Sequence, residues 1–238
     1  MTLLRTLSVG LIGLAMTPVA AEVAVGVSVN LTPPVLPVYA QPPIPAPGYL
    51  WTPGYWAYGP AGYYWVPGVW VQPPSVGVLW TPPWWGWVGG AYVFHAGYWG
   101  PHVGFYGGIN YGFGYGGVGF AGGRWQGGVF AYNHSVTNFG GVHVTNVYNE
   151  RVVVRTAGHA AFNGGPGGVR AAPTAAERVA EREQHVGATG PQGDHERGAA
   201  AHPGEARGPG PEGHGPGGQP HGQPHPHPEG HPHPEDHR

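Results

Sequence analysis

The fold is decided by four segments that repeat one pattern: Trp51-Thr-Pro-Gly54-Tyr-Trp56, Trp65-Val-Pro-Gly68-Val-Trp70, Trp80-Thr-Pro-Pro83-Trp-Trp85 and Phe94-His-Ala-Gly97-Tyr-Trp99. They start at residues 51, 65, 80 and 94, so successive starts are 14 or 15 residues apart. A spacing that holds through four units is an internal repeat. An aromatic residue at both ends gives each unit two large flat side chains in a fixed relation.

Each unit predicts two short strands separated by an irregularity at its Pro-Gly position, because this density of proline and glycine disfavours helix. Two strand arrangements are compatible with the pattern. If Pro53-Gly54 is a tight turn, Trp51 and Trp56 face each other across it; if it is a bulge, the chain reverses at Gly59-Pro60-Ala61-Gly62. Both arrangements give a mainly β fold: a small antiparallel sheet of short aromatic hairpins with Gly-rich loops, one short C-terminal helix and a disordered tail.

The repeat is followed by further motifs in a fixed order. They are Trp99-Gly-Pro-His-Val-Gly-Phe-Tyr-Gly-Gly108, Asn110-Tyr-Gly-Phe-Gly-Tyr115, Gly122-Gly-Arg-Trp125, Thr145-Asn-Val-Tyr148-Asn149, Asn163-Gly-Gly-Pro-Gly-Gly168 and Pro173-Thr-Ala-Ala-Glu177. With them, the chain resembles the exported bacterial proteins named for their WXXGXW (YXWGXW) repeat, over about residues 23–186. Pro83 departs from the turn glycine of that pattern and Phe94 from its leading tryptophan. The resemblance implies an exported cell-envelope protein of uncharacterised activity and supplies no catalytic residues.

The N-terminus has the layout of a secretory signal peptide over residues 1–21. Arg5 precedes an apolar run from Leu7 to Met16, and small residues end at Ala21. The run is shorter than the roughly 20 residues of a spanning helix, so we expect that the cleaved chain is not an integral membrane protein. We expect the protein to be exported to the periplasm, the outer envelope or the medium. The chain has no cysteine, which excludes a lipid-modified cysteine anchor and a disulfide framework.

Charged side chains are almost absent from the middle of the chain. Between Val23 and Asn149 the only one is Arg124. Nucleic-acid binding needs clustered basic residues, so we expect no nucleic-acid partner. General acid–base chemistry would need Glu22, Glu150 or the C-terminal third, so we expect no enzyme. His134-Ser135 is interpreted as a polar loop pair rather than a nucleophile.

The composition divides the remaining chain into segments. Residues 22–48 are read as a strand, with valines alternating from Val23 to Val29, followed by a solvated Pro-rich linker. Residues 49–99 are the repeat. Residues 100–156 are Gly- and aromatic-rich and then β-prone, including the run Val152–Val154, and are either flexible or ordered by aromatic packing. Residues 157–186 contain a linker and a helix predicted over 174–186, capped by Thr174 and Glu177. Residues 187–238 are predicted to be a disordered Gly/Pro/His-rich tail.

Two groups of side chains are the candidate functional residues. The repeat aromatics are Trp51, Trp56, Trp65, Trp70, Trp80, Trp85, Phe94 and Trp99. They either form the core, which we favour because Leu and Ile are scarce, or stack on sugars or a partner surface. The second group is the candidate metal ligands of the tail, which are His221, His225, His227, His231, His233 and His237. Neutral imidazoles suit Zn, Ni or Cu, although a flexible tail binds weakly.

Two functions follow from these groups. The first is a structural or interaction protein of the envelope that engages an envelope component or itself through the aromatic repeat, with no cofactor. The alternative is a metal-binding or metal-buffering protein that acts through the histidine tail.

Overall fold

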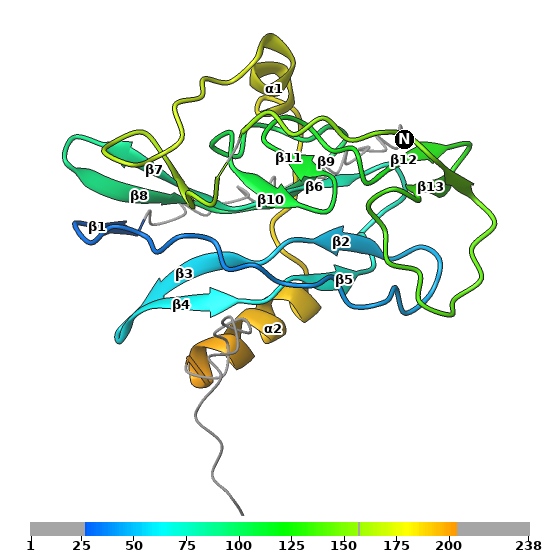
Figure 1. Cartoon of the computed structure of the whole chain (residues 1–238), viewed down its shortest axis with the longest axis horizontal. Coiled ribbons are helices and arrows are strands. Elements are labelled where there is room, and N and C mark those ends of the chain that lie inside the picture. Colours follow the sequence, from blue (N-terminus) through cyan, green and yellow to red (C-terminus); the bar gives the residue numbers. More distant parts are fainter. Residues whose placement is uncertain (1–26, 157, 204–238) are drawn as a thin grey trace, which may run out of the picture.

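The computed structural model describes residues 27–156 and 158–203. Its centre is two long β-hairpins, each made from two units of the repeat (Figure 1). The first hairpin consists of β2 (Leu50–Thr52), β3 (Tyr55–Gly59), β4 (Gly62–Val66) and β5 (Val69–Val71). The second consists of β6 (Leu79–Thr81), β7 (Trp84–Val88), β8 (Ala91–His95) and β9 (Tyr98–Gly100). In each hairpin the outer strands pair with each other and the inner strands pair with each other, all antiparallel.

The chain reverses at the tips of the hairpins and not at the Pro-Gly positions. The first reversal is at Gly59-Pro60-Ala61-Gly62, where proline fixes one φ and Gly62 has a φ of 100°. The second is at Gly89-Gly90, whose φ values of 58° and 93° fit the primed turn that matches strand twist. Of the two arrangements compatible with the sequence, the structure therefore has the bulge, with Pro53-Gly54 interrupting a continuous hairpin.

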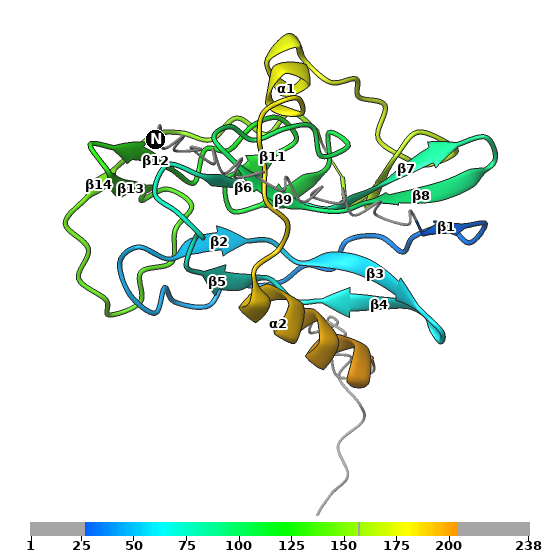
Figure 2. The same ribbon diagram turned by 180° about the vertical axis from the view of Figure 1, so that it is seen from behind.

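The two hairpins lie in separate layers, with the second above the first in Figure 1, and Figure 2 shows the same layers from behind. The remaining strands are β1 (Ser28–Val29), β10 (Asn110–Gly112), β11 (Tyr115–Gly116), β12 (Gly123–Gln126), β13 (Val129–Asn133), β14 (Val147–Tyr148) and β15 (Phe162–Asn163). Of these, β1 and β15 join the second hairpin, and the others form two small sheets of their own. β1 pairs antiparallel with β8, whereas β15 joins β7 and β14 joins β13 in parallel. The expectation of a mainly β fold of small antiparallel sheets with aromatic hairpins is confirmed. No strand forms at Val152–Val154, which was predicted from β-prone residues; Val153 and Val154 are largely exposed and gain no packing from a strand.

The Pro-rich segment is a strap packed on the first hairpin, and the prediction of a solvated linker there is wrong. Pro33, Leu36 and Tyr39 turn inward at a spacing of three residues, the period of polyproline II, and Leu36 is 5% exposed. Further on, Ile44 is 1% exposed and its N–H donates to the Asn138 carbonyl at 2.9 Å. The strap has few backbone donors, but its carbonyls remain available as acceptors. Only Ser28–Val29 of the predicted N-terminal strand is seen, and residues 22–26 lie outside the described part.

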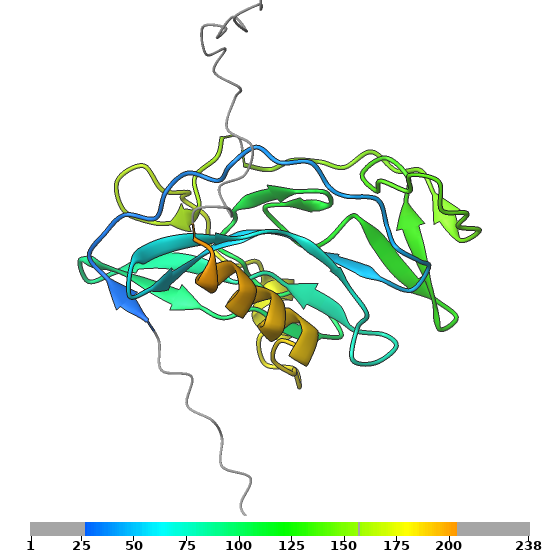
Figure 3. The same ribbon diagram turned by 90° about the horizontal axis from the view of Figure 1, so that it is seen from below.

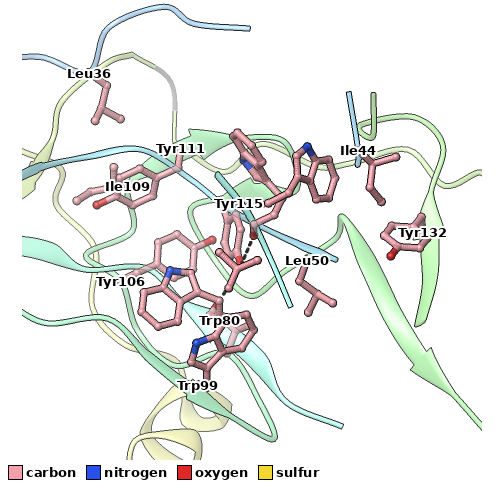
Figure 4. Close-up of a cluster of buried hydrophobic side chains, with 14 of the residues drawn as sticks. Leu36, Ile44, Leu50, Trp80, Trp99, Tyr106, Ile109, Tyr111, Tyr115 and Tyr132 are labelled. Atoms are coloured by element: carbon pink, nitrogen blue, oxygen red, sulfur yellow. Dashed lines mark hydrogen bonds between the residues drawn. The ribbon is translucent and has the colours of Figure 1, made fainter. Parts of the chain in front are cut away.

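The Gly-rich segment is ordered by buried tyrosines, which decides between the two alternatives that the composition left open (Figure 4). Tyr106, Tyr111 and Tyr115 are at most 4% exposed. Their hydroxyls donate to backbone carbonyls of Gly119 (2.9 Å), Pro83 (2.6 Å) and Trp80 (2.9 Å) respectively. Each ring therefore buries apolar area while its hydroxyl satisfies a carbonyl, which offsets the entropy cost of ordering glycine.

Two helices follow, where one was predicted. α1 (Ala175–Ala180) begins at the expected Thr174–Glu177 capping box, but it ends well before residue 186. Beyond it, Val186 exchanges two backbone hydrogen bonds with Trp99 of β9, at 2.8 and 2.9 Å, so tertiary pairing replaces further helix.

The second helix corrects the prediction that disorder begins at residue 187. α2 (Gly190–Ala201) packs against β4 and lies beneath the first hairpin, as Figure 3 shows from below. Ala199 is 8% exposed and contacts a cluster containing Ala57 and Val66. The predicted tail residues 204–238 and the predicted signal peptide 1–21 lie outside the described residues. Within residues 27–156 and 158–203, no helix has the length and apolar character needed to span a membrane.

Candidate functional site

The eight repeat aromatics form four facing pairs, one on each strand pair of the two hairpins. The pairs are Trp51–Trp70, Trp56–Trp65, Trp80–Trp99 and Trp85–Phe94. Their ring centroids are 5.3, 5.4, 5.3 and 5.0 Å apart, with interplanar angles between 52° and 65°. Tilted and edge-on pairs of this kind contribute about 0.5–1.5 kcal/mol each beyond the burial of their area.

Pairing joins different repeat units. The first aromatic of one unit faces the closing aromatic of the other unit in the same hairpin. A single unit therefore cannot satisfy its own aromatics, and two consecutive units are needed for one hairpin.

The motif glycine provides a seat for the opposing indole. A Cβ added to Gly54 would lie 2.3 Å from Cζ2 of Trp65, and one added to Gly68 would lie 2.3 Å from Cζ2 of Trp51. In the second hairpin, a Cβ on Gly97 would lie 2.4 Å from Cζ2 of Trp80. Real Cβ contacts are essentially never this short. The glycine is thus required for a close approach of the ring, since none of the three has a positive φ.

The fourth seat explains the two departures from the repeat pattern. Residues 83 and 94 of the second hairpin correspond to residues 54 and 65 of the first, because Trp85 faces Phe94 in the same register in which Trp56 faces Trp65. Pro83 fills the seat, and the ring that would occupy it is the smaller Phe94. The two departures are therefore one coupled change at facing positions.

Most of the repeat aromatics are buried. Trp51, Trp65, Trp70, Trp80, Trp85 and Trp99 are at most 9% exposed, whereas Trp56 and Phe94 are half-buried. This burial supports the interpretation of the repeat as core.

Four indole N–H groups are also hydrogen-bonded inside the protein. Trp56 and Trp70 donate to strap carbonyls of Val35 (3.0 Å) and Pro42 (2.9 Å). Trp85 donates to the Trp56 carbonyl and Trp99 to Gln192 Oε1, both at 2.8 Å. Trp51 Nε1 is buried with no hydrogen-bond partner among the described residues.

A pocket of about 170 Å³ lies beside Pro83 and Phe94, between the two hairpins and the segment that leads into α2. Its aromatic lining residues are Tyr55, Trp80 and Phe94, and Glu196 and His195 come from α2. Burial first, and then the nearby Glu196 carboxylate, raise the pKa of Tyr55 above its usual range. The sequence did not reveal this site, because α2 was not predicted. The signal was Thr189-Gly-Pro-Gln192, a second capping box with proline in the first turn.

A larger and more open hollow of about 430 Å³ lies at the β12–β13 end. Trp125, Val76 and Val129 line it, and no charged residue does. Trp125 is anchored by its indole N–H, which donates to the Val78 carbonyl at 2.9 Å.

The described histidines are dispersed over the fold. His95 stacks on Trp84 at 4.0 Å between ring centroids, and His102 Nδ1 lies 2.9 Å from Glu183 Oε1. No group of three His, Cys, Asp or Glu side chains suited to hold a metal occurs within the described ranges. The tail candidates His221, His225, His227, His231, His233 and His237 lie outside them. Ser135 donates its hydroxyl to the Glu150 carbonyl at 2.7 Å, so it faces backbone rather than His134.

These features define a class of protein: a β scaffold built from hairpins in which two repeat units pair their aromatics. The model of the WXXGXW repeat family matches the chain in two copies over residues 47–71. The chain therefore carries the WXXGXW repeat, and the two matched copies form the first hairpin. The searches of curated proteins and of solved structures gave no match.

Proposed function

We propose that this chain is an exported, non-catalytic protein of the cell envelope, in which the WXXGXW repeats form a rigid scaffold for an envelope component or a second copy of the chain. The four internal aromatic pairs carry this proposal. Their rings and four of their indole N–H groups are used within the fold, so the repeat supplies stiffness rather than a free stacking surface. The signal-peptide layout of residues 1–21 supports the export part.

The low charge of the scaffold supports interaction through apolar and backbone groups. Between Val23 and Asn149 the only charged side chain is Arg124, so little charge repulsion opposes association of this surface. Exposed valines such as Val76, Val88 and Val129 add apolar area at the surface, with exposed fractions of 65%, 60% and 51%.

Affinity fractionation tests the proposal. The full chain and a variant ending at residue 203 are used as bait with envelope extracts, and their own mass is measured by light scattering. The truncation starts after residue 203 because α2 packs on the first hairpin. We expect both baits to retain the same component, or both to self-associate. A chain that remains monomeric and retains nothing from the extract, or that stays in the cytoplasm with residues 1–21 intact, contradicts the proposal.

The histidine tail supports the second candidate. Six histidines lie within residues 221–237, and imidazole suits Zn, Ni or Cu. If metal binding is the function, the variant ending at residue 203 loses it, whereas the scaffold function survives. The same two proteins therefore separate the candidates.

A further inference from the structure

The pocket beside Phe94 arises where the repeat departs from its own pattern. At the three motif glycines, the six-membered ring of an indole lies against the glycine. At the fourth seat, Pro83 occupies that place and Phe94 lacks the second ring. Space is left between the hairpins, and residues 187–196 border it. Close packing normally leaves few voids larger than a water molecule. A hollow of about 170 Å³ is much larger than such a void and has room for a small ligand.

Three aromatic side chains, Tyr55, Trp80 and Phe94, line the pocket. Tyr55 of the first hairpin and Phe94 of the second stack at 6.2 Å between ring centroids, with an interplanar angle of 26°. Trp80 also lines the pocket, and its ring is held at 5.3 Å from Trp99. Aromatic faces carry partial negative charge and attract cations within about 6 Å.

Glu196 supplies the charge. No arginine lines the pocket, and Glu196 forms no salt bridge within the described residues. The hydroxyls of Tyr55 and Tyr64 lie close enough to hydrogen-bond its carboxylate, which leaves the negative charge uncompensated. The other polar side chains there are already engaged. Thr52 donates to the Val69 carbonyl at 2.8 Å, and Gln192 Oε1 accepts from Trp99. His195 Nε2 lies 2.8 Å from the Pro67 carbonyl, so this nitrogen is the donor. The pocket thus offers a carboxylate and aromatic faces but few free groups for the hydroxyls of a sugar.

We propose that this pocket binds a small organic cation of the substituted ammonium class, held by the Glu196 carboxylate and by the faces of Tyr55, Trp80 and Phe94. The volume limits the ligand to a few heavy atoms, since pockets for drug-sized molecules are about 300–1,000 Å³. Quaternary ammonium groups suit the combination because they gain from aromatic faces and need no hydrogen bond.

Calorimetric titration of the full chain tests this inference with two probes of the same shape. Choline carries the charge, and 3,3-dimethyl-1-butanol is its neutral isostere. The titrations are run at pH 8, where an ordinary histidine is neutral. We expect choline to bind about tenfold or more tightly than the isostere, the fold-change that a desolvated cation–aromatic contact gives. Equal affinity for the two probes, or no heat from either up to about 10 mM, overturns the proposal.

Two variants locate the site and one serves as control. Glu196→Gln keeps the shape and removes the charge, so it should remove the preference for choline and leave the isostere unaffected. Phe94→Trp should abolish binding of both probes, because Pro83 prevents the indole from entering the seat and forces it into the pocket. Asp194→Asn is the control, because this exposed acid on α2 is not part of the lining. If Glu196→Gln leaves the preference unchanged, the inference is wrong even if Phe94→Trp fails to fold.

Discussion

The coupling between a motif glycine and the facing tryptophan predicts a specific pattern of stabilities. The change to make is Gly54→Ala, which places a methyl group 2.3 Å from Cζ2 of Trp65 and 2.9 Å from the Gly68 nitrogen and the Val66 oxygen. Overpacking a core in this way typically costs about 1–3 kcal/mol, and contact with backbone atoms puts Gly54→Ala at the upper end.

Trp65→Phe, made alone, should also destabilise the protein. Trp65 is 2% exposed, and truncation to phenylalanine leaves a void whose cost is smaller than the roughly 3–5 kcal/mol of Trp→Ala. The double variant resembles the pair Pro83 and Phe94, because in both a residue larger than glycine faces a phenylalanine. Because the smaller ring vacates the space that the methyl group needs, we expect the double variant to be about 1–2 kcal/mol more stable than the sum of the two changes.

Urea unfolding followed by tryptophan fluorescence measures all four proteins of this cycle. The two contacts at 2.9 Å are with backbone and persist in the double variant, so rescue should be partial. Gly141→Ala is the control, since a Cβ there meets nothing within 4 Å and its φ is not positive; it should change stability by less than about 0.5 kcal/mol. Additivity of the two changes to within about 0.5 kcal/mol would refute the seat mechanism.

Three further predictions concern burial, pH and the second helix. Trp70→Ala should cost about 3–5 kcal/mol, and Trp56→Ala less because its ring is only half-buried, as thermal melts will show. Partial burial of its ring, which stacks on Trp84, lowers the pKa of His95, and Glu181 partly opposes this shift. Stability should therefore fall as pH drops below about 6.5, where the unfolded chain takes up the proton first. His95→Gln should flatten that dependence in melts recorded from pH 5 to 8. Gln192→Leu should leave the buried Trp99 N–H without its acceptor and cost about 1–3 kcal/mol in urea unfolding.

Each of these three has an outcome that contradicts it. Unchanged cooperative transitions in both tryptophan variants would show that Trp70 and Trp56 do not contribute to the core. A pH profile for His95→Gln that follows the parent chain would remove that histidine as the cause. If Gln192→Leu unfolds at the same urea concentration as the parent, α2 is not held through the Trp99 indole.

The sequence alone determined the building units of this protein. The spacing of the aromatics predicted short antiparallel strands, because proline and glycine exclude helix and an aromatic pair needs facing positions. The Thr174–Glu177 capping box predicted the start of α1, because a cap is a local interaction between residues three apart. The first prediction rests on the composition and spacing of each unit, and the second rests on a contact within one helical turn. Both are local properties of the chain, and for that reason the sequence alone revealed them.

The candidate site could be predicted only in part. The eight aromatics of the repeat were named from the sequence, but their partners were not, because facing pairs such as Trp51–Trp70 join different units. The sequence did not indicate that Glu196 belongs to a site. Glu196 approaches Tyr55 from α2, and this helix was not predicted because its segment is rich in glycine, proline and alanine. In the strap, the inward-facing residues Pro33, Leu36 and Tyr39 are three positions apart, and this period is the sequence feature that corresponds to its packing.

Tertiary structure decided what the local pattern left open. Pro53-Gly54 is compatible with a turn or a bulge. The structure has the bulge, because it allows Trp51 to face Trp70 and Trp56 to face Trp65 across one continuous hairpin. The Gly-rich segment is ordered only because Tyr115 and its neighbours find carbonyls on strands far away in the chain. In each case the deciding energy comes from burying large aromatic rings against residues distant in sequence, and no local propensity records that energy.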